Sequence, residues 1–137
     1  MNYLAEVHAK GEQAKEAARL LATLPTLVKN RALLAMADGL LANTQAILAA
    51  NAADLENGKA RGLSQALLDR LMLNETRVRS MAEGLREIAA LPDPIGEIIE
   101  GWRRPNGLEI VKARVPLGVI GIIYEARPNV KIGRAHV

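Results

Sequence analysis

A single run of residues, Pro116 to Val130, constrains the fold of this chain more than any other segment. It reads PLGVIGIIYEARPNV, an apolar stretch with glycines at positions 118 and 121 that leads directly into a polar cluster. Short Val/Ile runs bounded by turn residues are typical of strands buried on both faces, as in a parallel sheet. Open α/β sheets bind ligands just beyond the carboxyl ends of such strands. We therefore expect one strand of an α/β sheet here, followed by part of a ligand site.

The composition favours helices in the rest of the chain and excludes several classes of protein. Half of the 137 residues are apolar but only 2% are aromatic, and the alanines and leucines that supply the apolar mass are strong helix formers. The absence of cysteine excludes a disulfide framework and a thiolate metal site. No apolar run approaches the length of a membrane span, and the first residues lack the pattern of a signal peptide. We therefore expect a cytoplasmic protein with no membrane partner.

The net charge of +3 gives little support for nucleic-acid binding. Two of the 18 basic residues, Lys131 and Arg134, lie in the last seven positions, so the remaining 16 balance the 15 acidic residues to within one charge. The other charges are interleaved along predicted helix faces, whereas a surface that follows phosphates needs a basic stripe. We expect no nucleic-acid partner.

Apolar residues recur at helical spacing through the first part of the chain, which predicts five helices. They are expected at about 2–23, at 27–42, from 43 or 44 to 59, in a short segment after Ser64, and from Asn74 onward. Thr26, Ser64 and Asn74 are candidate N-caps, and Gly62 marks the end of the third helix. The second helix is expected to present a broad apolar face formed by Leu33, Leu34, Met36, Ala37, Leu40 and Leu41. The last helix has the clearest stripe, formed by Val78, Met81, Ala82, Leu85, Ile88 and Ala89.

A β-hairpin is predicted after these helices, because the apolar period changes from helical to alternating at Gly96. Its strands are expected at 97–104 and 108–115, with Asn106-Gly107 supplying the positive φ angles of a tight turn. Trp102, Ile98 and Ile99 could form a core face or contact a partner. The exposed edge of an isolated hairpin favours the partner contact.

Several separate motifs, taken in order, resemble one family, gamma-glutamyl phosphate reductase, also called glutamate-5-semialdehyde dehydrogenase. The resemblance covers about residues 1–130 and includes the signature Pro116–Val130 with its Tyr-Glu-Ala-Arg-Pro-Asn sequence. The other matching motifs are Asn51-Ala-Ala-Asp54, Gly62-Leu63-Ser64, Asp69-Arg70-Leu71, Arg77, Met81-Ala82-Glu83-Gly84-Leu85, Leu91-Pro92-Asp93-Pro94 and Gly96.

This resemblance implies an α/β fold of the aldehyde dehydrogenase type, in truncated form. Residues 1–95 would be the helical N-terminal part of the cofactor-binding domain, and 96–115 an oligomerisation hairpin. Residues 116–130 would be the first strand of the dinucleotide-binding sheet. The tail, 131–137, departs from the family and resembles translated sequencing-adapter DNA, so we exclude it from the predicted fold.

The family reaction implied by the resemblance belongs to proline biosynthesis. It reduces L-glutamyl 5-phosphate with NADPH to L-glutamate 5-semialdehyde and phosphate, through a thioester on a cysteine thiolate. Glutamate 5-kinase would be the pathway neighbour, and the full-length enzyme would be a homo-oligomer. Because this chain has no cysteine, we expect it to be inactive alone. The alternative is a self-contained helical protein-interaction module without catalytic activity.

The resemblance also implies roles for the residues that follow the predicted strand. Backbone and side chains of Ile123, Tyr124, Glu125 and Ala126 would pass the adenosine side of NADP(H). Ile123 could instead be sheet core, and Glu125 could pair with Arg127 rather than touch a ribose hydroxyl.

Arg127 is the candidate substrate-binding residue, since a planar guanidinium suits both the carboxylate and the phosphate of the substrate. Arg127 could instead form an ion pair at the surface. Asn129 lies near the position of the asparagine that stabilises the oxyanion, although an ungapped match places Arg127 there, and Asn129 could equally cap a helix or turn.

Other polar residues have structural interpretations. His8 has no second ligand at useful spacing, so no metal site is expected. Asn51 and Asp54 are expected to cap or brace helices, while Gly118 and Gly121 are expected to permit a close backbone approach.

Overall fold

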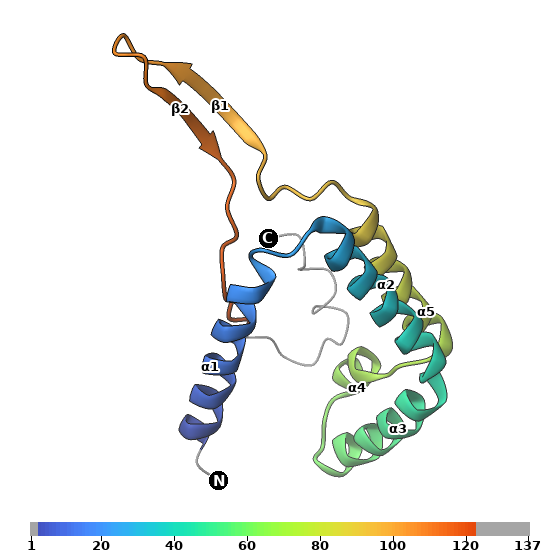
Figure 1. Cartoon of the computed structure of the whole chain (residues 1–137). Coiled ribbons are helices and arrows are strands. Elements are labelled where there is room, and N and C mark those ends of the chain that lie inside the picture. The colour runs from blue at the N-terminus through green and yellow to red at the C-terminus, as the bar shows by residue number, and fades with distance from the viewer. Residues whose placement is uncertain (1–2, 123–137) are drawn as a thin grey trace. The chain divides into compact units, whose positions relative to one another are not determined.

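The computed structural model describes residues 3–122, which form a series of helices followed by a hairpin (Figure 1). Two compact units are distinguishable: a hairpin unit made of 1–26 and 92–121, and a helical unit that contains 27–91. The elements are α1 (Tyr3–Leu21), α2 (Thr26–Ala42), α3 (Thr44–Ala60), α4 (Gln65–Leu71), α5 (Glu75–Ala90), β1 (Ile98–Arg103) and β2 (Glu109–Ala113).

The core of the helical unit lies between α2 and α5, which run side by side (Figure 1). Ala37 of α2 is fully buried against Ala82 and Leu85 of α5. Leu33, Leu40 and Leu41 pack around this cluster. The broad face predicted for α2 is too wide, because Leu34 and Met36 are 43% and 57% exposed. Only a narrow stripe of α2 around Ala37 is therefore covered by α5.

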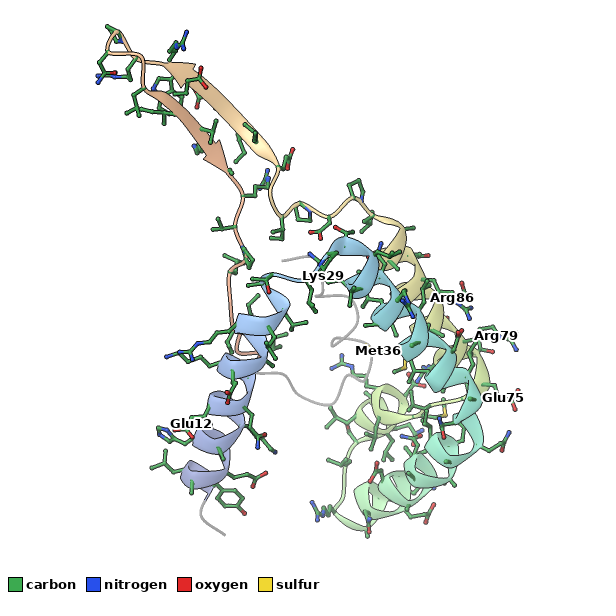
Figure 2. The ribbon with its side chains drawn as sticks, in the orientation of Figure 1. Glu12, Lys29, Met36, Glu75, Arg79 and Arg86 are labelled. Carbon is green, nitrogen blue, oxygen red and sulfur yellow. The ribbon has the colours of Figure 1, made fainter. Side chains whose placement is uncertain are left out.

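The structure confirms the helix that the sequence predicts from Asn74 onward, which is α5. Asn74 is the N-cap, and its side-chain oxygen accepts a hydrogen bond of 2.8 Å from the backbone nitrogen of Arg77. Val78, Ala82 and Leu85 of the predicted stripe are buried. The labelled side chains of Glu75 and Arg79 extend outward from α5 (Figure 2).

The end of α3 is a glycine-dependent cap. Gly62 has φ +75°, its nitrogen donates to the carbonyl of Lys59, and the nitrogen of Leu63 donates to the carbonyl of Gly58. These two bonds define a Schellman motif. A Cβ atom on Gly58 would lie 3.0 Å from the Leu63 side chain, which would have to shift by a few tenths of an ångström to accept it. The prediction that Gly62 terminates the helix is confirmed.

Asn51 braces the connection between α4 and α5. Its side chain is buried, donates to the carbonyl of Leu71 at 3.0 Å and accepts from the nitrogen of Leu73 at 2.7 Å. Arg77 holds the same connection, because its guanidinium donates to the carbonyl of Met72 at 2.5 Å and also to that of Asp69. The predicted bracing role of Asn51 is confirmed, whereas Asp54 is exposed on α3.

The hairpin unit contains the antiparallel pair β1 and β2, with an irregularity between Ile98 and Glu100. Its turn lies at the predicted residues, between Arg104 and Leu108. The nitrogen of Gly107 donates to the carbonyl of Arg104, which makes Pro105 the second residue of a four-residue turn. Proline cannot adopt positive φ, so Gly107, at φ +85°, supplies the left-handed residue after the turn.

Helix α1, in the same unit, has no buried residue. Residues 116–122 form no strand in the described part of the chain, and the rest of the predicted strand, 123–130, lies outside the described residues. A strand requires a hydrogen-bonded neighbour, and none is paired with 116–122 there.

Within residues 3–122, no single helix is both long and apolar enough to cross a membrane. The bent pair α2 and α3, which meet at 68°, passes that test of length and composition only when the two helices are taken together.

Candidate functional site

The predicted site residues lie beyond the part of the chain that the structure describes. This applies to every residue proposed to bind cofactor or substrate, or to act on the oxyanion: Ile123, Tyr124, Glu125, Ala126, Arg127 and Asn129. Their roles remain predictions. The structure does describe the segment that leads into them, Pro116–Ile122, and its surroundings within the hairpin unit.

A cleft of about 550 Å³ separates this segment from α1. Pro116, Gly118 and Val119 form one side, and Gly11 and Ala18 belong to the α1 side. Small side chains on α1 leave room for the cleft, because neither glycine nor alanine fills the space above the helix. The beginning of the family signature therefore lies against an open, mostly apolar surface.

Helix α1 has an apolar side, to which Gly11 and Ala18 of the cleft lining belong. Its apolar and small residues alternate at spacings of three and four, which places them on one side of the helix. These residues are Leu4, Val7, Gly11, Ala14, Ala18 and Leu21. The predicted helix is confirmed, and the stripe is left uncovered: Leu4 and Val7 are 70% and 67% exposed. An exposed apolar stripe of this kind is typical of a surface that packs against another domain or another protein.

Two cations line the cleft, Lys15 and Arg19, one helical turn apart on α1. No salt bridge of either side chain is present among the described residues. The cleft therefore combines an apolar floor with positive charge at its edge. Such a surface can hold an acidic group, but it contains no nucleophile or general base.

The titratable groups with shifted pKa values belong to exposed ion pairs away from the cleft. A hydrogen bond from Lys10, together with its charge, lowers the pKa of Glu6. Hydrogen bonds to Asp38 and Glu83 raise the pKa of Arg86, whose side chain is labelled in Figure 2. Pairs of this type stabilise a surface and do not indicate acid–base chemistry.

Residues 3–122 contain no group of three His, Cys, Asp or Glu side chains placed to hold a metal ion. His8 is exposed on α1.

Comparison with known proteins finds relatives that share one name. The gamma-glutamyl phosphate reductase of Moorella thermoacetica is 64% identical over 135 residues, which cover 98% of this chain and 32% of the relative. The chain is homologous to the N-terminal third of gamma-glutamyl phosphate reductase. The protein of the same name from Clostridium novyi is 58% identical over 134 residues, 98% of this chain and 31% of the relative. No protein-family model matches the chain.

Solved structures agree with this assignment. The gamma-glutamyl phosphate reductase of Thermotoga maritima matches with a TM-score of 0.89 and 41% identity, covering 93% of this chain and 31% of that one. The Saccharomyces cerevisiae protein matches with a TM-score of 0.82 and 33% identity, over 88% of this chain and 31% of that one. The predicted family and the truncated fold are confirmed, and the alternative of an independent helical interaction module is not favoured.

The chain spans about a third of the length of the curated relatives that it matches. Sequence reasoning missed the cleft beside α1. Its signal was available in the small residues Gly11 and Ala18, with Lys15 and Arg19 one helical turn apart between and beside them.

Proposed function

We propose that this chain supplies the N-terminal part of a gamma-glutamyl phosphate reductase. The complete enzyme would reduce L-glutamyl 5-phosphate with NADPH to L-glutamate 5-semialdehyde and phosphate in proline biosynthesis. The observation that carries the proposal is the 64% identity over 98% of this chain. The TM-score of 0.89 with the Thermotoga maritima reductase supports it independently through the backbone.

The exposed apolar surface of the hairpin unit supports the same proposal. The approach to the signature is exposed at Val115 and Leu117, each 74%, and at Val119, 51%. An uncovered apolar surface of this kind is unfavourable in water and indicates a packing partner. The partner we propose is the part of a reductase that corresponds to the unmatched two-thirds of the relatives, which covers both this segment and the α1 stripe.

The cofactor assignment rests on the residues after the strand. NADP(H) would lie along Ile123–Ala126 and supply the hydride. The described end of the segment is compatible with a bound group, because a Cβ atom at Gly118 or Gly121 would meet nothing within 4 Å. No part of the described chain makes the close approach predicted for these glycines, so a ligand or another domain remains the proposed neighbour.

Arg127 is proposed to bind the substrate through its guanidinium, and Asn129 to donate to the oxyanion of the acyl intermediate. The nucleophilic cysteine would come from the part of the enzyme that this chain does not contain. Glutamate 5-kinase would supply the acyl phosphate. A homo-oligomer is proposed through the hairpin, whose strand residues are exposed except for Ile110, which is half-buried.

A chimera tests the function. Residues 1–130 would replace the matching third of the Moorella thermoacetica enzyme, and oxidation of glutamate 5-semialdehyde in the presence of phosphate and NADP⁺ would be followed by NADPH absorbance. We expect turnover within about tenfold of the parent, since well-packed substitutions cost less than about 1.5 kcal/mol. The same enzyme lacking this third is the negative control. A folded chimera without activity would refute the proposal.

Arg127→Ala and Arg127→Lys in that chimera test the substrate role. Loss of a charge-assisted bidentate contact is expected to raise the KM for phosphate or semialdehyde, with only partial recovery in the lysine variant. Wild-type KM and turnover in Arg127→Ala would show that the assignment is wrong, while leaving the family function intact.

A further inference from the structure

The hairpin turn holds an Asn-Gly pair, Asn106–Gly107, that is exposed to solvent. In such a pair the backbone nitrogen of the glycine can attack the side-chain amide of the asparagine, because glycine carries no Cβ to hinder the approach. A second pair, Asn57–Gly58, lies in α3. The two pairs have the same residues, but one lies in an exposed turn and the other in a helix. Asn57–Gly58 can therefore serve as an internal control for reaction at Asn106–Gly107.

We propose that Asn106 is a site of spontaneous deamidation and that the fold protects Asn57 from the same reaction. The nitrogen of Gly107 loses its proton to solvent base and forms a bond to Cγ of Asn106. The Cγ–Nδ2 bond then breaks and ammonia leaves, so that a succinimide ring remains. Water opens the ring at either carbonyl, which gives aspartate or isoaspartate. The sum is the conversion of an amide and water into an acid and ammonia.

The turn geometry assists the first step. The backbone nitrogen of Leu108 donates a hydrogen bond of 3.2 Å to Oδ1 of Asn106. When the nitrogen of Gly107 adds to Cγ, negative charge develops on this same oxygen. A backbone donor already directed at that atom stabilises the tetrahedral intermediate, as in an oxyanion hole. The structure thus adds an electrostatic contribution that the Asn-Gly sequence alone does not provide.

One hydrogen bond opposes the attack. The nitrogen of Gly107 donates to the carbonyl of Arg104 at 2.9 Å, and this bond must open before the nitrogen can reach Cγ. Because the turn is exposed and lies at the end of a two-stranded hairpin, local opening requires no loss of buried contacts. The reactive conformation is therefore accessible without unfolding the rest of the hairpin unit.

The helix restrains Asn57, in contrast to the exposed Asn106. The Asn57 carbonyl accepts from the nitrogen of Arg61, and Gly58 is buried beneath Leu63 and Leu68, whose side chains lie 3.0 and 3.2 Å from where a Cβ would be. Ring closure requires rotation about the Asn57 backbone, which would break the last turn of α3 and this packing. The reaction at Asn57 must therefore wait for local unfolding of the helix.

Deamidation would change the hairpin tip in two ways. An aspartate adds a negative charge beside the basic pair Arg103 and Arg104. An isoaspartate lengthens the backbone by one carbon between Asn106 and Gly107. This change displaces Gly107 from the φ of +85° on which the pairing of Arg104 with Leu108 depends.

The experiment incubates the full 137-residue chain at mildly alkaline pH and follows both sites by peptide mapping with mass spectrometry. We expect Asn106 to deamidate at least about tenfold faster than Asn57 in the native buffer, because helix-protected sites react only from locally open states. In denaturant the two rates should become nearly equal. Similar rates in native buffer would overturn the proposal, and so would a tenfold preference that persists in denaturant.

Gly107→Ala provides the matched variant. A Cβ hinders the attacking nitrogen, so the rate at Asn106 should fall by about tenfold or more while Asn57 is unchanged, the usual consequence of crowding at a left-handed glycine position. Asn106→Asp supplies the chromatographic standard for one product. If Gly107→Ala deamidates at residue 106 as fast as the parent, attack by this backbone nitrogen is excluded.

Discussion

The helical unit and the hairpin unit contain similar kinds of side chain but differ in what they bury. In the helical unit, Ala37, Val78 and Ala82 are completely shielded from solvent. In the hairpin unit, Ile98 and Val111 are 63% and 60% exposed. Apolar content is therefore not what makes a core. Four helices can cover one another's apolar sides, whereas one helix and two strands leave theirs exposed.

The largest expected effect is a difference in stability between a valine-to-aspartate substitution in the helical unit and the same substitution in the hairpin unit. Val78→Asp places an unpaired carboxylate in a fully buried position and is expected to destabilise the helical unit by more than about 3 kcal/mol. Loss of helical circular dichroism at lower denaturant concentration would measure it. Val111→Asp, on the exposed hairpin, is the matched control and should leave the helical signal unchanged. Equal effects of the two variants would contradict the comparison.

Asn51→Ala should give the next largest effect. It leaves the carbonyl of Leu71 and the nitrogen of Leu73 without partners in a partly buried connection, at a cost of about 1–3 kcal/mol. Denaturant unfolding checks this value. Asn106→Ala removes the single bond to Leu108 in an exposed turn, and should not shift the same transition.

Gly62→Ala should cost about 1–2 kcal/mol, because φ +75° brings Cβ close to the following carbonyl oxygen. Gly118→Ala forces the same strain at φ +90° in the hairpin unit. Since nothing else packs around Gly118 in the described residues, we expect the segment there to relax without shifting the thermal unfolding of the helices. A common shift in both variants would show that the units unfold together.

The smallest effect should come from Glu6 on α1. Its pKa is lowered by the hydrogen bond and charge of Lys10, so the folded helix favours the ionised form. Its contribution is present above the pKa of the unfolded chain and is lost as the pH falls through the lower folded pKa. Helix content should therefore decline slightly with acidification, and Glu6→Gln should remove this part of the profile. An unchanged profile in Glu6→Gln would assign the decline to other carboxylates.

The sequence predicted the helices well because their boundaries depend on local chemistry. The Asn74 cap and the Gly62 terminus each require only a few neighbouring residues. The hairpin turn was predictable for the same reason, because Pro105, Asn106 and Gly107 form a local turn signal between Arg104 and Leu108. The width of the α2 face was harder to predict, since the exposure of Met36 depends on which side of α2 packs against α5, and α5 lies far away in sequence.

The candidate site shows the other limit of sequence reasoning. The signature at Pro116–Val130, together with the other motifs in order, was sufficient to indicate the family. The cleft beside α1 was not predicted, because it arises where two segments separated by about a hundred residues meet. Arg127 and Asn129 lie outside the described residues, so their roles remain predictions.

The bracing of the α4–α5 connection has a consequence for mutational tolerance. Asn51 and Arg77 contact backbone carbonyl and amide groups there, not the side chains of the residues they hold. The hydrogen bonds that hold the connection therefore do not involve the half-buried side chains of residues 72 and 73. A saturation library at these two positions should accept a wide range of residues, with proline at 73 excluded because it has no N–H to donate to Asn51.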